Sequence, residues 1–280
     1  MPIHDQGYRH YAGSRARHGR SWWVIARSAI KAHVRQPRVI VLLLAAWFPF
    51  LVYAVRFYLA VNFQQAAQVL GPGPGVFREF LDVWQGVFVF FFTILIGSGL
   101  IADDRRANAL QIYLAKPISR VEYIVGKLAV LVAFLGAITW LPGILLLLLQ
   151  MMFAGNTTFL RENAFLFPAI TVFAAVQIFL YALLILALSA LSKSRRFVAM
   201  TFAGVVLFTQ AIAAVLRRIT GTTWAWLSPE DTLDVIADAA FRTTGESALP
   251  VPIAVLVVLV LMAVAVLVLE RRVRGVEVVS

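Results

Sequence analysis

Six long apolar runs constrain this chain more than any other feature of its sequence. The hydrocarbon core of a bilayer is about 30 Å thick, and a helix needs about 20 residues to cross it. The runs lack the alternation of a membrane β-barrel, so helices are the structure that satisfies their backbone in lipid. We therefore predict an all-α, polytopic membrane protein with six transmembrane helices. The predicted spans are Val39–Phe57, Val83–Ala102, Ile124–Met152, Phe165–Leu191, Phe197–Leu216 and Val251–Leu269.

Composition supports this class of protein. Hydrophobic residues make up 61% of the 280 residues and charged residues 14%, whereas soluble domains average about 45–50% and about 25%. One soluble core could not bury so much apolar surface. The chain has no cysteine, which excludes disulfides, thiolate metal sites and cysteine nucleophiles.

The basic residues predict the orientation of the spans. All but six of the 25 Lys and Arg residues fall in residues 1–38, 103–127, 192–196 and 270–280. The six others are Arg56, Arg78, Arg161, Arg217, Arg218 and Arg242. Because Lys and Arg concentrate in cytoplasmic loops, we expect both termini in the cytosol. The net charge of +11 then follows from topology, and we expect no nucleic-acid partner.

The first 37 residues divide into two parts. Residues 1–20 are polar and basic without the apolar segment of a signal peptide, which predicts a disordered cytosolic tail. Residues 21–37 predict an amphipathic helix lying in the cytosolic membrane interface. Its apolar stripe comprises Trp22, Ile25, Ala29 and either Ala32 or His33. Its interfacial aromatic and basic residues are Trp22, Trp23, Arg27, Lys31 and Arg35. A plain basic anchor before the first span is the alternative, and both place this segment at the membrane surface.

A charged segment separates the second and third runs. Asp103 and Asp104 favour the positive end of a helix, and Ala107, Leu110 and Leu114 share one helical face. We therefore predict a short amphipathic helix over residues 103–115, ended by the proline that follows. The sequence Ser119-Arg120-Val121-Glu122 is a capping box that opens the third span. A simple connector needs no apolar face, so docking of a soluble partner is the favoured role.

Residues 222–246, between the fifth and sixth runs, form a second structured segment. Ser228, Pro229, Glu230 and Asp231 are typical of a helix N-terminus, with a cap, a proline at the first position and acids in the first turn. The apolar residues that follow recur with helical spacing. We expect a half-buried helix on the outer membrane face that either gates an exit path or caps the bundle.

No catalytic or metal-binding pattern is present in this sequence. The four histidines lie before residue 34, and the HExxH, GxSxG and Walker A patterns are absent. We therefore expect no catalytic residue, no metal site, no bound cofactor and no enzymatic activity in this chain. Spans two to five hold no charged residue in their middles, whereas an ion-driven carrier usually keeps one there.

The charged segment resembles the first cytoplasmic loop of ABC-2-type permeases, the membrane subunits of many bacterial ABC exporters. The resemblance rests on Asp103-Asp104-Arg105-Arg106, Leu110 to Leu114, Lys116-Pro117-Ile118-Ser119-Arg120, Glu122 and Gly126-Lys127. The family often has Gly-Thr where this chain has Ala107-Asn108, and Glu where it has Asp. In layout the resemblance extends to the amphipathic first helix, the six spans and the structured outer segment.

The resemblance implies an ATP-driven transporter built from several parts. Residues 38–280 would form one six-span transmembrane domain in the bacterial inner membrane, paired in a homodimer and served by two copies of a separate ATPase. ATP and Mg would bind in that ATPase. The residues implied in coupling are Asp103, Asp104, Arg105, Arg106, Leu110, Leu114, Ser119, Arg120 and Glu122. The segment 222–246 would match the outer re-entrant or gate region, and a periplasmic partner would have only short loops to dock on.

Transport out of the cell is the direction that the resemblance implies, and the substrate stays open. Two other functions stay open as well. A stand-alone secondary transporter or channel would need an ion-coupling residue within a span. An intramembrane lipid-modifying enzyme would need clustered acids or histidines near one face, and Asp103-Asp104 is the one such cytosolic pair in the sequence.

Overall fold

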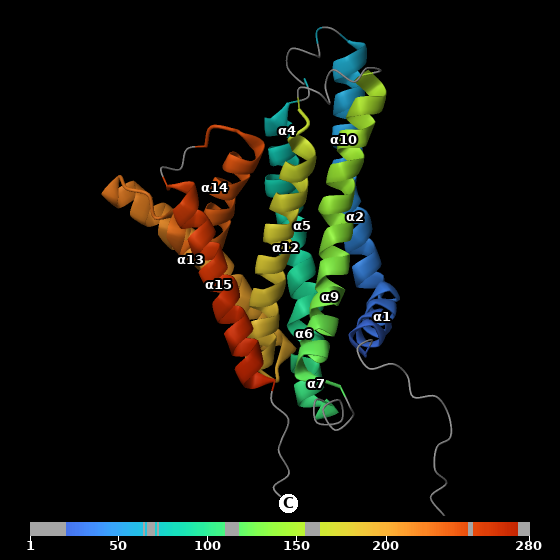
Figure 1. The fold of residues 1–280 in the computed structure, drawn as a ribbon, viewed down its shortest axis with the longest axis vertical. Helices are drawn as coiled ribbons and strands as arrows, with labels where there is room; N and C mark the ends of the chain where they lie inside the picture. The colour runs from blue at the N-terminus through green and yellow to red at the C-terminus, as the bar shows by residue number, and fades with distance from the viewer. Residues whose placement is uncertain are drawn as a thin grey trace, which may run out of the picture.

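The computed structural model describes residues 21–63, 65, 71, 73–109, 118–154, 163–245 and 249–273, and it is all-α within these ranges. Six helical stretches are long and apolar enough to cross a membrane, which confirms the predicted number of spans and a multi-pass membrane protein. They are Pro37–Asn62, Pro74–Arg106, Arg120–Phe153, Leu166–Leu191, Arg195–Thr220 and Val251–Arg272. Figure 1 shows most of them running along the long axis of the molecule.

Some spans are single helices and others are built from several pieces. The single ones are α2 (Pro37–Asn62), α12 (Leu166–Leu191), α13 (Arg195–Thr220) and α15 (Val251–Arg272). Span two comprises α4 (Pro74–Arg78), η1 (Glu79–Trp84), α5 (Gln85–Phe92), η2 (Thr93–Gly97), α6 (Ser98–Leu100) and α7 (Ala102–Arg106). Span three comprises α9 (Arg120–Ile138) and α10 (Trp140–Ala154). The remaining elements are α1 (Ser21–Val34), the short η3 (Ala225–Leu227) and α14 (Pro229–Phe241).

Span two begins at Pro74, earlier than the predicted Val83. The added turns carry Arg78, Glu79 and Asp82. Their charges lower the hydropathy of this part of the span, so an apolar run does not include it. These charges are paired in the fold: Arg78 reaches Asp82, and Arg56 of α2 lies 3.3 Å from Glu79. Ion pairing is what allows charged side chains to occupy the end of a span.

The six spans differ strongly in how far the fold encloses them. Two thirds of α12 is buried (67%), whereas α2 and α13 are 22% buried and α15 is 17% buried over their apolar windows. Aromatic rings tie neighbours to α12: Tyr181 packs edge-on against Phe202, with ring centroids 5.8 Å apart. α12 is therefore the centre of the bundle, and α13 leaves the other spans at one end (Figure 1).

The bundle has two chemically different ends. One end, the basic end, holds α1, α7, the α12–α13 turn and the last turn of α15 (lower part of Figure 1). The opposite end holds α4 and α14 (upper part of Figure 1). Positive-inside statistics predict that the basic end faces the cytosol.

Candidate functional site

The loop that leaves span two is attached to the start of span three by a buried ion pair. The ammonium Nζ of Lys127 lies 2.7 Å from Oδ2 of Asp104, and the two side chains are only 8% and 19% exposed. The hydroxyl of Tyr123 donates a hydrogen bond of 2.7 Å to the same carboxylate oxygen. Asp104 is therefore satisfied within the chain, so it holds α7 against α9.

The same loop is attached to the end of span four. The Arg105 guanidinium donates to the carbonyl of Ala190. The Ser189 hydroxyl accepts hydrogen bonds from the backbone N–H groups of Ile101 and Ala102, at 3.1 and 2.9 Å, and donates to the Ser98 carbonyl at 3.1 Å. These contacts fix the corner between α6 and α7 to the end of α12.

Two residues of the predicted coupling set point away from the bundle. Asp103 and Arg106 are exposed. The helix does not continue unbroken across 103–115 as expected, because α7 ends at Arg106 and Asn108 adopts a left-handed φ of 53°. Asn tolerates that conformation better than most residues. Leu110 and Leu114 lie outside the described residues.

The predicted capping box at the start of span three is confirmed. The backbone N–H of Glu122 donates to the Ser119 hydroxyl at 3.1 Å, and the Ser119 N–H donates to the Glu122 carboxylate at 3.0 Å. Arg120 is the first residue of α9 and is exposed. Ser119 and Glu122 thus stabilise the helix start, which is a local role.

α1 packs its apolar face against the start of α9. Ile25 and Ala26 are buried, and a side chain at Gly126 would meet Ile25 and the Trp22 carbonyl at 3.0 Å, so the glycine permits the close approach. His33, rather than Ala32, completes the buried face. Trp23, Arg27 and Lys31 of α1 are exposed, and so is Arg35 just after its end. The amphipathic division predicted for this helix is confirmed.

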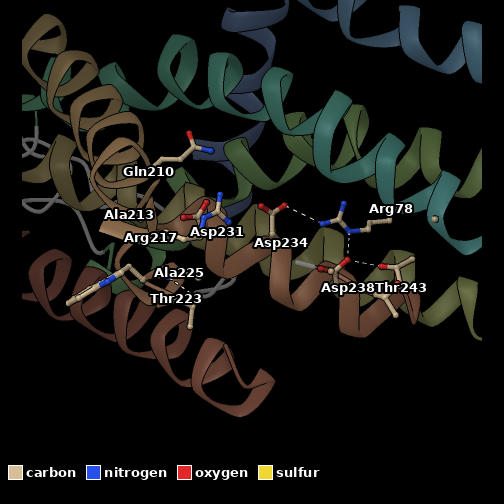
Figure 2. A pocket seen from close by; sticks show the side chains of 14 residues that line it. Arg78, Gln210, Ala213, Arg217, Thr223, Ala225, Asp231, Asp234, Asp238 and Thr243 are labelled. Atoms are coloured by element: carbon tan, nitrogen blue, oxygen red, sulfur yellow. Dashed lines mark hydrogen bonds and ion pairs between the residues drawn. The ribbon is translucent and has the colours of Figure 1, made fainter. Parts of the chain in front are cut away.

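At the opposite end, a polar pocket of about 640 Å³ lies between α4, α13 and α14. Figure 2 shows Arg78 reaching across to two carboxylates of α14. Its Nε lies 2.6 Å from Asp238, and its Nη2 lies 3.5 Å from Asp234 and 3.5 Å from the buried Asp82. The Thr243 hydroxyl donates to Asp238 at 2.7 Å. One arginine therefore ties span two to α14.

α14 is half-buried as expected, with seven buried residues among its thirteen, and its first turn reaches into the bundle. The Tyr181 hydroxyl donates a hydrogen bond to the Glu230 carboxylate. Tyr181 lies fifteen residues into α12, which is about 22 Å along a helix. Ser228 caps the helix by accepting from the Asp231 N–H at 3.3 Å, and Pro229 stands at its first position, as predicted.

Burial changes the acid strength of the first turn of α14. It raises the pKa of Glu230 above its ordinary value, and the nearby charges of Asp234 and Asp231 act in the same direction. The Tyr181 hydrogen bond opposes the shift but is weaker than burial. Burial likewise raises the pKa of Asp231, and Asp234 adds to it, while Arg217 lowers it. Asp231 lines the pocket together with Asp234, Asp238 and the two arginines Arg78 and Arg217.

Sequence reasoning found the cap of α14 but missed its partners. The i, i+4 pairs Arg78/Asp82 and Asp234/Asp238 were the available signal, because each pair places two charges on one helix face. Which face meets which depends on how α4 and α14 pack. Across the described ranges, no three His, Asp or Glu side chains converge as a metal site.

No protein-family model and no curated protein matches this chain. The geometry at the two ends of the bundle therefore carries the functional argument.

Proposed function

We propose that this chain is the membrane-spanning permease subunit of an ATP-driven transporter of the ABC-2 type, working as an exporter with a separate ATP-binding subunit. The main support is the way the loop after span two is attached. Asp104 binds Lys127 of span three, and Arg105 binds the end of span four. A force applied to α7 from outside is thus transmitted to three spans.

The exposed residues beside these attachments form the proposed docking face. Asp103 and Arg106 are exposed on α7. At the same end, Arg27 and Lys31 are exposed on α1 and Arg35 in the turn after it. An ATP-binding subunit that carries ATP and Mg would seat on this face. Two permease copies and two ATP-binding subunits would make one transporter.

The other end of the bundle would act as the outer gate. α14 reaches inward to Tyr181 and is attached to span two through Arg78. A movement of α7 would therefore be transmitted to α14, because α7 is the last part of span two and α14 is bonded to that span. Coupling of this kind requires that the connected helices, here span two and α14, can adopt two discrete arrangements. The pocket of about 640 Å³ beside α14 would then open to the outside.

The proposal places the basic end in the cytosol of a bacterial inner membrane. Because the sequence has no cysteine, single-cysteine labelling can test this cleanly. A membrane-impermeant maleimide applied to spheroplasts should label Thr244→Cys and spare Ser194→Cys, both of which replace exposed residues. The reverse labelling pattern would place α7 outside the cell and end the proposal.

Docking is tested by charge reversal on α7. The tagged chain is purified from the membranes of its native host, and the ATPase activity that co-purifies with it is measured. Arg106→Glu should lose most of the partner, since like charges across an interface cost several kcal/mol. Arg218→Glu, an equally exposed arginine at the opposite end, is the control. Unchanged assembly and activity in Arg106→Glu combined with Leu110→Asp would count against the docking role.

A specific observation also favours a second candidate, a stand-alone proton-coupled carrier or channel. Asp82 in span two is buried, and Glu230 reaches the middle of α12. Buried carboxyl groups at such depth are typical of proton relays. If this candidate holds, the purified chain alone will dissipate a pH gradient across pyranine-loaded liposomes, and Glu230→Gln will slow the flux. The permease proposal expects no flux above that of empty liposomes.

A further inference from the structure

A narrow apolar groove runs along the bundle toward its basic end. It has a volume of about 160 Å³, and all its lining residues are apolar. Leu188 and Leu191 of α12 form its floor, Val205 of α13 forms one wall, and Val264 and Val268 of α15 form the other. Leu261 and Val268, the outermost lining residues of α15, are about 10 Å apart along the helix axis. This length is shorter than the hydrocarbon depth of one leaflet, which is about 15 Å.

Three exposed cations stand where this groove ends. Arg271 and Arg272 follow Val268 by three and four residues, which places them one turn further along the same face of α15. Lys193 follows Leu191 by two residues, in the turn between α12 and α13. Within the described residues, none of the three forms an ion pair. Glu270, the adjacent acid, lies on the face of Val266 instead.

We propose that this groove and its three cations bind one anionic phospholipid of the leaflet at the basic end. One acyl chain lies along Leu188, Val205 and Val264, and the phosphate lies among Lys193, Arg271 and Arg272. Basic pockets between transmembrane helices on the cytoplasmic side bind anionic headgroups in this way. The apolar walls alone would accept any lipid, so the cations supply the selectivity.

The lining of the groove together with the cations at its end argues for a phospholipid over a helix of a second copy. Every lining residue is apolar, as a hydrocarbon chain requires. The groove leads to three cations without an ion pair in the described part of the chain, which matches the charge of an anionic headgroup at the end of that chain of hydrocarbon.

Native mass spectrometry of the purified, delipidated chain tests this inference without any ATP-binding subunit. The probes are palmitoyl-oleoyl phosphatidylglycerol and palmitoyl-oleoyl phosphatidylcholine, which share their acyl chains. We expect tighter binding of the first phosphatidylglycerol molecule than of phosphatidylcholine. The triple variant Lys193→Gln, Arg271→Gln, Arg272→Gln should weaken that first step more than about tenfold, since each cation near anionic lipid contributes about fivefold.

Matched variants separate the site from general charge and hydrophobicity. Arg27→Gln, Lys31→Gln, Arg35→Gln removes the same charge at α1 and the turn after it. This variant should leave the first binding step within about twofold, because these residues belong to a different helix from those that line the groove. Val264→Trp fills the groove and should weaken phosphatidylglycerol binding, whereas Val266→Trp, at the same depth of α15 on another face, should not. Inorganic phosphate should not compete, because it lacks the acyl chain.

Several results would overturn the proposal. Equal loss in the two triple variants would assign the effect to net charge. Equal effects of Val264→Trp and Val266→Trp would remove the groove from the site. If the Lys193 triple variant binds lipid normally and instead loses only the co-purified ATP-binding protein, these cations are a protein-docking face. That last result would leave the permease proposal standing while the lipid site falls.

Discussion

Lys127 and Asp104 form a buried ion pair, with Nζ 2.7 Å from Oδ2, that joins the loop after span two to the first turns of span three. Tyr123 completes it, since its hydroxyl bonds the same carboxylate and its ring lies beneath the ammonium group at 5.4 Å. The pair turns a charged connector into a fixed part of the bundle, and its removal is the first prediction.

Lys127→Met should lower the thermal stability of the detergent-solubilised chain. Breaking one side of a buried pair costs about 3 kcal/mol because the remaining charge has lost its partner. The melting temperature, followed by tryptophan fluorescence, should fall by about 5–10 °C. The double variant Lys127→Met, Asp104→Leu should recover most of this loss, and Lys31→Met, at an exposed site of α1, should change little. A double variant as unstable as the single one would show that the pair is not the cause.

Gly126→Val should separate α1 from α9. A Cβ at this position already meets Ile25 and the Trp22 carbonyl at 3.0 Å, so a larger side chain forces the helices apart. Ala26, a fully buried residue of α1, provides the readout as Ala26→Cys. We expect maleimide to label this cysteine in the Gly126→Val background and to spare it otherwise.

The same helix offers the control for that experiment. At Gly136 an added Cβ would meet nothing within 4 Å, so Gly136→Val should leave Ala26→Cys protected. Labelling in both backgrounds would mean that β-branching in α9, and not the contact with α1, releases the helix.

Arg78 and Asp238 should show strong energetic coupling. Their contact of 2.6 Å joins span two to α14, and Asp82 and Asp234 share the same guanidinium. A double-mutant cycle with Arg78→Met and Asp238→Asn should give a coupling free energy of about 1–3 kcal/mol, from unfolding measured in detergent. Arg218→Met with Asp238→Asn is the control cycle and should be additive. A coupling near zero for Arg78 would remove it as the link to α14.

Glu230→Gln should stabilise the chain at neutral pH and reduce its response to pH. Burial raises the pKa of Glu230 above its ordinary 4.5, so the folded state binds a proton that the unfolded state has released. The stability that this proton provides is complete below pH 4.5 and is lost as pH rises through the folded pKa.

The measurement is the melting temperature from pH 8 to pH 5. The wild type should gain stability on acidification relative to Glu230→Gln, and at pH 8 the variant should melt about 1–3 °C higher. The pKa of Asp231 is also raised, so Asp231 contributes a response of the same sign in both proteins. Glu270→Gln, which replaces an exposed acid, should follow the wild type. A variant with the full wild-type response would place the titrating group elsewhere.

Helix starts were the features of this fold that the sequence predicted most closely. The capping box at Ser119 and Glu122 and the cap of α14 at Ser228 both form as expected, because each depends on residues within one turn. The number of spans was equally predictable, since crossing a bilayer requires a run of apolar residues long enough to do so.

The interior contacts of charged residues were not predictable in the same way. Arg78 and Asp82 made the outer part of span two look like a loop, and Asp104 was expected on a partner-facing helix although it binds Lys127. Asn108 interrupts the helix expected through that loop. In each case the decisive partner lies on another helix, far away in the sequence.

The sequence by itself determined that this protein is a six-span, all-α membrane protein with an amphipathic first helix, because apolar length and helical periodicity are properties of consecutive residues. Only the tertiary structure decided that α14 inserts toward Tyr181, that Arg78 holds it there, and that α7 is fixed to spans three and four. Those contacts depend on which helix faces meet. Packing sets that choice, because a buried charge must find its partner wherever the fold brings one within reach.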